Sequence, residues 1–392
     1  MYAVDGLGLG HVTRLLGLAR ALRRRMPRAE ILFLTASEAS HVIYREGFAA
    51  LKVPSRSAAR SGGLRRDTFV RLTQSAVWSA LTAFDPHALV VDTFAAGALG
   101  ELPPVLRWAG RKIFVFRAQR PERAQEAGLQ NLLALYDLIL VPHHPNSEEV
   151  PTPDSVPCVW TGPMLGRGVG EVLSREDARR LLELPLEADI GLISLGGGGD
   201  PDLAAARRTL RAAIEAGDAA SAVAKVLWVE MAGPLSADAL SIHAEANASS
   251  RARFRVLRDV HPQMLFCRAF DCAIAAAGYN TAHELQAVEV PTLLWPFPRE
   301  VDDQEKRAAD FARDGRALFF GATDATSPQS TLERDLRTLC NPIVRERLKI
   351  GMAAHAALFA ERGGAWSGTE VGALAILRIL GLEGEEMATD EV

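Results

Sequence analysis

The chain contains two series of short apolar segments that alternate with amphipathic ones. The apolar segments end at Thr35, Asp92, Phe116 and Val141 in the first half, and at Leu195, Met231, Leu257, Ala275 and Pro296 in the second. Polar and apolar residues do not alternate within them, which is typical of strands buried on both faces of a parallel sheet. Strands separated by helices, the first helix over residues 12–26, predict an α/β fold with two Rossmann-like halves.

A proline-rich stretch separates the two series. Six prolines fall between Pro142 and Pro163, without any helical periodicity, which indicates extended chain. A length of 392 residues also exceeds one ordinary core. We therefore expect a first Rossmann-like domain at residues 1–150, a linker at 151–165, a second such domain at 166–365, and a C-terminal helix with an acidic tail at 366–392.

The composition excludes several classes of protein. A net charge of −4 argues against a nucleic-acid binder that relies on a basic field. The four cysteines show neither a CxxC pair nor zinc spacing, so we expect a reduced, cytoplasmic protein without a bound metal. A signal peptide is not evident, and no apolar run reaches the ~20 residues of a membrane-spanning helix. Peripheral membrane contact stays open.

A glycine-rich turn follows the first strand, as Gly6-Leu7-Gly8-Leu9-Gly10-His11, and leads directly into the first helix. The second strand ends in Thr35-Ala36-Ser37-Glu38, and the spacing G-x-G-x-x-G is absent, which argues against NAD or FAD. His11 is expected at the carboxyl end of the strands, where ligands bind in open α/β sheets. It is either a general base or a helix-start residue that hydrogen-bonds the loop.

A second glycine turn opens a helix at Gly278-Tyr279-Asn280-Thr281. Gly278 would let a phosphate approach the backbone, and the N–H groups of Asn280 and Thr281 would face a pyrophosphate. Glu284 either closes a capping box with Thr281 or accepts hydrogen bonds from a ribose diol. Further along, Asp303 and Gln304 either hold sugar hydroxyls or cap the helix that starts near Gln304.

The segment Gly8-Leu9-Gly10-His11-Val12-Thr13-Arg14 resembles the N-terminal loop of GT-B glycosyltransferases related to the peptidoglycan UDP-GlcNAc transferase that makes lipid II. The segment from Gly278 to Glu284, with Asp303-Gln304, resembles the donor-binding segment of the same group. The resemblance spans most of the chain and implies two Rossmann-like domains with parallel sheets that face a central cleft. Members of that group open with a longer first strand, which leaves open whether residues precede Met1.

The resemblance also implies roles for individual residues. In that group the C-terminal domain binds the nucleotide sugar, so Glu284 would hold the ribose, and Gln304 with Asp303 the donor sugar. Arg258 would border the base, and the glycine loop at Gly196, Gly197 and Gly198 would face the diphosphate or the cleft. The acceptor would bind the N-terminal domain near His11. The segment 56–71 is basic and polar, unlike an apolar lipid-binding loop.

The expected function is metal-independent, inverting transfer of a sugar from a nucleoside diphosphate-sugar, UDP-linked before dTDP-linked, to a small-molecule or lipid-linked acceptor. His11, or a carboxylate such as Asp92, would deprotonate the acceptor. No cofactor besides the donor is expected. Two alternatives remain: a nucleotide-sugar hydrolase, with water activated by His11, and a non-catalytic nucleotide-sugar binding subunit. Oligomeric state cannot be read from the sequence.

Overall fold

The computed structural model describes residues 1–4, 9–107, 110–120, 128–145, 147–148, 150–196, 202–216, 221–233, 254–321, 328–360 and 364–382. The chain folds into two compact units. The first unit combines Met1–Gly166 with Ser367–Val392, and the second consists of Arg167–Trp366.

A seven-stranded parallel sheet forms the centre of the first unit, in the order β3-β2-β1-β4-β5-β6-β7. The strands are β1 (Tyr2–Ala3), β2 (Leu32–Thr35), β3 (Ala49–Lys52), β4 (Ala88–Asp92), β5 (Arg111–Val115), β6 (Leu138–Val141) and β7 (Cys158–Trp160). The order of the first six is that of the doubly wound Rossmann fold. The order reverses between β1 and β4, which makes this pair the topological switch point.

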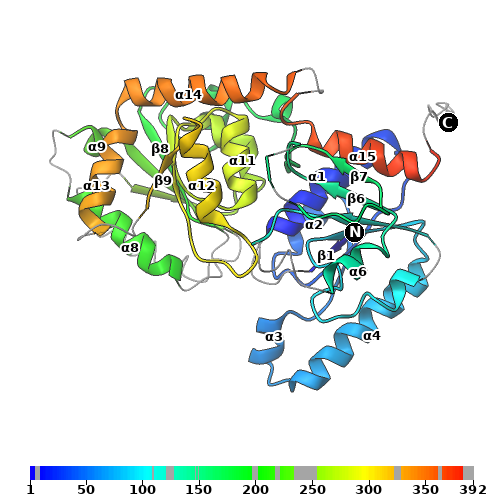
Figure 1. The fold of residues 1–392 in the computed structure, drawn as a ribbon. Helices are drawn as coiled ribbons and strands as arrows, with labels where there is room; N and C mark the ends of the chain where they lie inside the picture. Colours follow the sequence, from blue (N-terminus) through cyan, green and yellow to red (C-terminus); the bar gives the residue numbers. More distant parts are fainter. Residues whose placement is uncertain are drawn as a thin grey trace, which may run out of the picture. The chain divides into compact units, whose positions relative to one another are not determined.

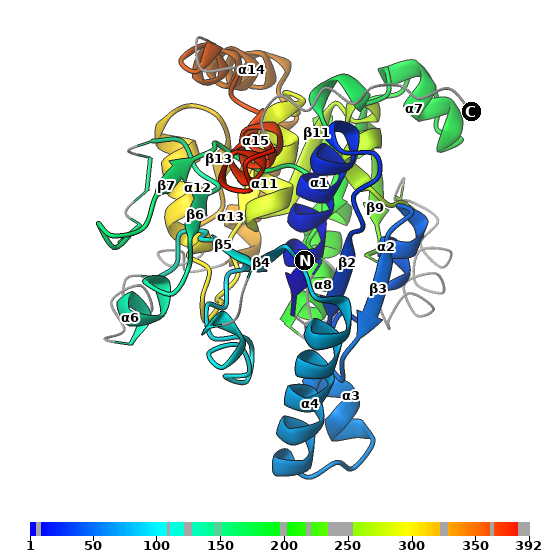
Figure 2. The ribbon, with the colours of Figure 1, turned by 90° about the vertical axis from the view of Figure 1, so that its right-hand side faces the viewer.

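Helices cover the first sheet (Figures 1 and 2). They are α1 (Gly10–Arg25), α2 (His41–Arg45), α3 (Arg56–Ser61), α4 (Arg66–Phe84), the 3-10 turn η1 (Val105–Arg107), α6 (Leu129–Leu133) and α15 (Gly368–Ile379). In α4 the residues Phe69, Thr73, Val77 and Leu81 are buried, one per helical turn. Val77 and Leu81 belong to the hydrophobic core of this unit, whereas Leu72, Trp78 and Phe84 of the same helix are exposed.

The last helix in the described residues, α15, lies beside the first, α1, although most of the sequence separates them (Figure 1). Small residues allow this close approach. A Cβ atom on Gly17 of α1 would stand 2.1 Å from the carbonyl oxygen of Leu165, and one on Gly372 of α15 would stand 2.7 Å from Met164. Outside this seam, Arg25 pairs with Glu370 at 2.7 Å. A side chain at Gly17 would therefore displace backbone, whereas a side chain at Gly372 would displace only the end of the Met164 side chain.

The second unit repeats the architecture with a six-stranded parallel sheet in the order β10-β9-β8-β11-β12-β13. Its strands are β8 (Ile190–Ser194), β9 (Leu227–Met231), β10 (Phe254–Leu257), β11 (Cys272–Ala276), β12 (Thr292–Trp295) and β13 (Leu318–Phe319). The Trp228 ring fills the space above Gly191, where a Cβ atom would approach the ring to 2.4 Å. Here the switch point lies between β8 and β11.

Helices also surround the second sheet. They are η2 (Val169–Glu171), α7 (Arg175–Leu181), α8 (Asp202–Glu215), α9 (Ala222–Lys225), η3 (Gln263–Ala269), α11 (Tyr279–Ala287), α12 (Gln304–Arg313), α13 (Pro328–Leu339) and α14 (Pro342–Ala357). The two parallel sheets establish the α/β fold class predicted from the sequence. None of the helices in the described residues is long and apolar enough to cross a membrane.

Three segments differ from the expectations. The proline-rich stretch expected as a linker contains β7, which pairs with β6 at the edge of the first sheet. Residues 56–71, for which no secondary structure was predicted, contribute to α3 and α4. The expected C-terminal helix is α15 and belongs to the first unit, so that unit is discontinuous in sequence. The acidic tail after Leu382 lies outside the described residues.

Candidate functional site

Each unit brings a helix start and a strand end together at its switch point. In the first unit, α1 begins at Gly10, shortly after β1, and Asp92 is the last residue of β4. In the second unit, Gly196 follows β8, and Gly278 precedes α11 directly after β11. Ligands of open α/β sheets bind outside the carboxyl ends of the strands at this position. The two switch points are therefore the candidate sites.

His11 and Asp92 form a close pair in the first unit. The Nδ1 atom of His11 lies 2.8 Å from Oδ2 of Asp92, whose side chain is completely buried. The ring of Phe94, in the loop after β4, stacks on the His11 ring at 5.5 Å between centroids. A carboxylate at Nδ1 favours the tautomer that carries its proton on this nitrogen, which makes Nε2 the basic atom. The structure thus brings together the two residues expected to act on the acceptor.

Arg14 is a third member of this cluster, and sequence reasoning gave it no role. Its Nε donates to Oδ1 of Asp92 at 3.2 Å and its Nη2 donates to Oδ2 at 3.0 Å. Burial alone would raise the pKa of Asp92, but Arg14 and His11 outweigh it and hold the pKa below its usual range. Asp92 is consequently a fixed, buried anion that orients His11. The sequence did contain one signal for Arg14. It follows His11 by three residues, and residues three apart in a helix lie on the same face.

The loop after β4 is held by a buried acid. Glu101 accepts a hydrogen bond from the Tyr2 hydroxyl, and its Oε2 accepts another from the Leu99 amide at 2.7 Å. Gly97 has φ +81° and leaves room for this carboxylate, because a Cβ there would stand 2.5 Å from the carboxyl carbon. Burial and the adjacent Glu101 raise the pKa of Tyr2 well above its usual value. The loop that carries Phe94 is therefore anchored to the first strand.

The turn before α11 forms the candidate site of the second unit. Gly278 is the N-cap of the helix and provides no side-chain cap, while Asn280 and Thr281 are half-buried in the first turn. After the neighbouring strand β8, Gly196 has a φ of +117°, a backbone conformation that favours glycine. A helix start of this kind offers N–H donors to an anion. Gly8, Gly197 and Gly198 lie outside the described residues.

Glu284 does not form the capping box considered for it. Because Gly278 is the N-cap, Thr281 lies inside the helix, and Glu284 is too far along to reach the cap backbone. That alternative is wrong. Glu284 is a buried carboxylate, and its negative charge, after burial itself, raises the pKa of the Cys267 thiol.

Asp303 and Gln304 open α12. Oδ1 of Asp303 accepts a hydrogen bond from the Lys306 amide at 3.0 Å, so the capping alternative for this residue is confirmed. Oε1 of Gln304 accepts from the Phe297 amide at 3.0 Å, and its Nε2 lies 3.9 Å from where a Cβ on Gly278 would stand. The carboxamide of Gln304 is thus next to the glycine turn.

A second arginine missed by sequence reasoning joins α12 to this turn. Nη1 of Arg307 donates to the carbonyl oxygen of Ala277 at 2.7 Å, and Nη2 donates to Oδ1 of Asp302 at 2.7 Å. This contact fixes the backbone directly before Gly278. No sequence motif around Arg307 could have indicated this contact, because the acceptor is a backbone carbonyl oxygen in the turn between β11 and α11.

Arg258 follows β10 and is half-buried. Its Nη2 atom is buried without a hydrogen-bond partner among the described residues. A buried guanidinium nitrogen without a partner is costly, so a ligand oxygen at this position would be favourable. Within the described part of the chain, no cluster of three or more His, Cys, Asp or Glu residues could hold a metal ion.

The chain is similar in sequence and in fold to known glycosyltransferases. No family model matches the sequence. Over 100 residues the chain is 31% identical to the UDP-N-acetylglucosamine--N-acetylmuramyl-(pentapeptide) pyrophosphoryl-undecaprenol N-acetylglucosamine transferase of Opitutus terrae. That match covers 25% of this chain and 26% of the relative, about a quarter of its length.

Solved structures match over nearly the whole chain. MurG of Acinetobacter baumannii has a TM-score of 0.59 at 17% identity, covering 96% of this chain and 99% of that one. UGT2 of Phytolacca americana, complexed with UDP-2fluoro-glucose and pterostilbene, has a TM-score of 0.63 at 14% identity, covering 96% and 98%. The spinosyn forosaminyltransferase SpnP has 0.62 at 14%, covering 97% and 98%. The chain has the GT-B fold and resembles the MurG group.

Proposed function

We propose that this protein is a glycosyltransferase that moves a sugar from a nucleoside diphosphate-sugar, preferably a UDP-sugar, to a small-molecule or lipid-linked acceptor. The observation that carries the proposal is the His11–Asp92 pair at the switch point of the first sheet, in a chain with the GT-B fold. The four cysteines are free, as expected in the reducing cytoplasm, where we place the reaction.

In the proposed reaction the acceptor hydroxyl gives its proton to Nε2 of His11. The acceptor oxygen forms a bond with the anomeric carbon of the donor as the bond from that carbon to the diphosphate breaks. A single displacement of this kind inverts the anomeric configuration. Asp92, ionised and held by Arg14, stabilises the imidazolium as it forms.

The second unit would hold the donor. The uncapped helix start at Gly278 suits the diphosphate, with Asn280 and Thr281 in its first turn. Glu284 would accept hydrogen bonds from the ribose, and the Gln304 carboxamide, with Asp303, would contact the sugar. The unpartnered nitrogen of Arg258 would meet the base or its ribose.

The leaving diphosphate would be stabilised by helix N–H groups rather than by a metal ion. The proposal involves no cofactor besides the donor itself.

Thermal melting with UDP and dTDP, each with and without EDTA, tests donor binding. UDP should raise the melting temperature through binding to the folded state, and EDTA should leave the increase unchanged. An increase that disappears with EDTA contradicts the metal-free proposal. Incubation with UDP-sugars and an acceptor panel then follows UDP release. Equal release without acceptor indicates the hydrolase, and binding without any turnover indicates the binding subunit.

A further inference from the structure

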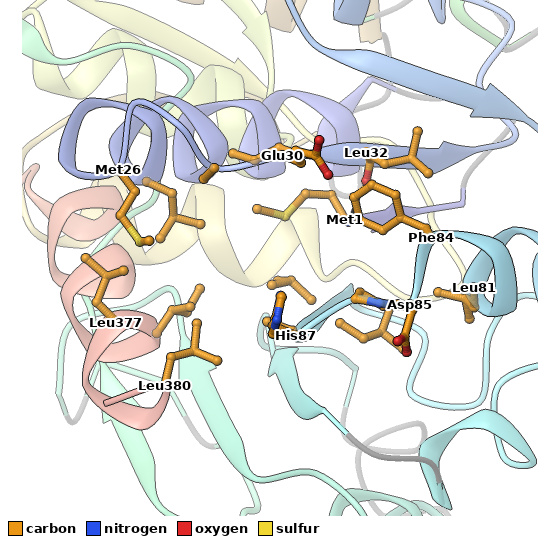
Figure 3. A pocket seen from close by; sticks show the side chains of 18 of the residues that line it. Met1, Met26, Glu30, Leu32, Leu81, Phe84, Asp85, His87, Leu377 and Leu380 are labelled. Atoms are coloured by element: carbon orange, nitrogen blue, oxygen red, sulfur yellow. Dashed lines mark hydrogen bonds between the residues drawn. The ribbon is translucent and has the colours of Figure 1, made fainter. Parts of the chain in front are cut away.

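The turn that follows Asp92 in the first unit is strained. Thr93 has a φ of +67°, and the amide of Phe94 donates to the carbonyl oxygen of Asp92 at 2.8 Å. A hydrogen bond between residues i and i+2 around a positive φ forms a classic γ-turn, which is rare and strained. The other described non-glycine residue of this unit with positive φ is Asp85, exposed beside an apolar cavity at the amino ends of β2 and β4 (Figure 3). Aspartate tolerates this conformation, whereas a β-branched residue is a genuine outlier there.

Hydrogen bonds to β5 and to the loop after it hold Thr93 in this conformation. Its amide donates to the carbonyl oxygen of Val115 at 3.1 Å, and its carbonyl oxygen accepts from Nε2 of Gln119 at 3.2 Å. The Thr93 hydroxyl does not help to hold the turn, because Oγ1 is buried without a hydrogen-bond partner among the described residues. Strained residues persist only where their surroundings determine the backbone. The Val115 contact joins two backbone groups, so Gln119 is the side chain that holds the turn.

Both neighbours of Thr93 contact His11. The Asp92 carboxylate lies 2.8 Å from Nδ1 of the imidazole, and the Phe94 ring stacks on its face with 20° between the ring planes. The γ-turn folds the chain back directly after β4 and so brings these two side chains to the same imidazole. If the strained turn relaxed to extended backbone, Phe94 would move away from Asp92, and the imidazole would lose the stacked ring.

We propose that Gln119 is a positioning residue for His11. Its carboxamide holds the strained turn at Thr93, the turn places the Phe94 ring, and the ring fixes the plane of the imidazole. This role rests on the proposed function, in which the oriented imidazole takes the acceptor proton. A base that can leave its orientation reacts more slowly, because reacting groups must be held in a near-attack geometry.

The test replaces Gln119 by Met, which has a similar length but cannot donate a hydrogen bond. NMR of histidine-labelled protein observes the His11 imidazole. His11→Asn identifies its signals, and Phe94→Leu shows where they lie without the stacked ring. Gln119→Met should move the His11 signals towards their position in Phe94→Leu. The control is Gln130→Met: Gln130 donates to the carbonyl oxygen of Pro151, also at 3.2 Å, and its loss should leave the His11 signals in place.

A rescue variant separates the release of strain from the loss of the side chain. Glycine adopts a positive φ without strain. Thr93→Gly in the Gln119→Met protein should therefore return the His11 signals to their original position. Signals that do not move in Gln119→Met would overturn the proposal, and so would failure of Thr93→Gly to restore them.

Turnover gives a second readout. Gln119→Met should lower kcat about 2–10-fold, the rate equivalent of one aromatic contact, at unchanged affinity for UDP, and Thr93→Gly should restore it. The melting temperature of Gln119→Met should stay within about 4 °C of the unmodified protein, as expected for the loss of one hydrogen bond. Displaced His11 signals at unchanged kcat would overturn the role in catalysis. An unmodified protein that neither transfers nor hydrolyses the donor sugar would refute the proposed function, while the NMR signals would still decide whether Gln119 positions His11.

Discussion

The Nδ1 atom of His11 lies 2.8 Å from Oδ2 of Asp92, and the two residues flank the reversal of strand order in the first sheet. The carboxylate is completely buried, so it orients the ring without meeting solvent itself. The sequence left open whether His11 or Asp92 would deprotonate the acceptor, and this geometry favours His11. His11 is the candidate base, and Asp92 is the residue that positions it.

Replacement of His11 tests the base. His11→Ala should lower kcat by about 10²–10⁴-fold, the usual contribution of a general base. His11→Asn should lower it similarly, because an amide can hydrogen-bond but cannot take up the proton. UDP titration should give unchanged affinity for both variants, since the donor residues belong to the second unit. Near-normal turnover of His11→Asn would mean that this residue only positions the loop.

Asp92 should contribute to stability above about pH 4. Its pKa in the folded protein is held below the ordinary value of 3.8, so its contribution is complete at neutral pH and is lost as the pH falls through the folded pKa. Asp92→Asn should therefore cost about 3 kcal/mol at pH 7, and the difference from the unmodified protein should shrink below pH 4. Urea unfolding of both proteins between pH 2 and 7 measures this, and a difference independent of pH would contradict it.

Arg14 should matter mainly through Asp92. Arg14→Leu leaves a buried carboxylate with one partner fewer, which should cost about 3–5 kcal/mol of unfolding free energy. The double variant Arg14→Leu/Asp92→Asn removes both charges and should recover much of that loss, while turnover stays low. Denaturant unfolding of the three variants forms a double-mutant cycle. Additive losses would show that the two side chains are not coupled.

Glu284 should affect donor binding more than folding. Because it does not cap α11, Glu284→Gln, which keeps the shape but not the charge, should melt close to the unmodified protein. Its affinity for UDP should fall about tenfold or more, as expected for a charged hydrogen bond worth roughly 1.5–3 kcal/mol. Isothermal titration with UDP and thermal melting separate the two effects. A lower melting temperature at unchanged affinity would assign Glu284 a structural role.

Most strands were predictable from the sequence because they are short apolar runs, whereas β3, β7 and β13 were not predicted. The apolar segments predicted to end at Asp92, Val141 and Leu257 end at the same residues as β4, β6 and β10. The helix α4 was missed because only one side chain per helical turn is buried, which leaves a weak apolar periodicity in the sequence. The strand β7 was missed because prolines flank it, yet an edge strand needs hydrogen bonds on one side only.

The site was predictable only in part. His11 was apparent from the glycine turn, but its pairing with Asp92 depends on the order of strands in the sheet, which no local pattern encodes. The capping box at Thr281 was wrong because a four-residue pattern does not fix where a helix begins, and Gly278 starts it earlier. Arg307 contacts a backbone carbonyl, so no partner residue type could have indicated it.

The packing of α15 on α1 has a consequence for synthesis of the chain. The second unit is translated in full between the two parts of the first. Until α15 leaves the ribosome, the face of α1 at Leu18 lacks its neighbour Gly372, although the seven strands of the sheet have long been made. On the ribosome, the unit that emerges first is therefore the last to finish folding, and its nascent form presents an apolar helix face to chaperones.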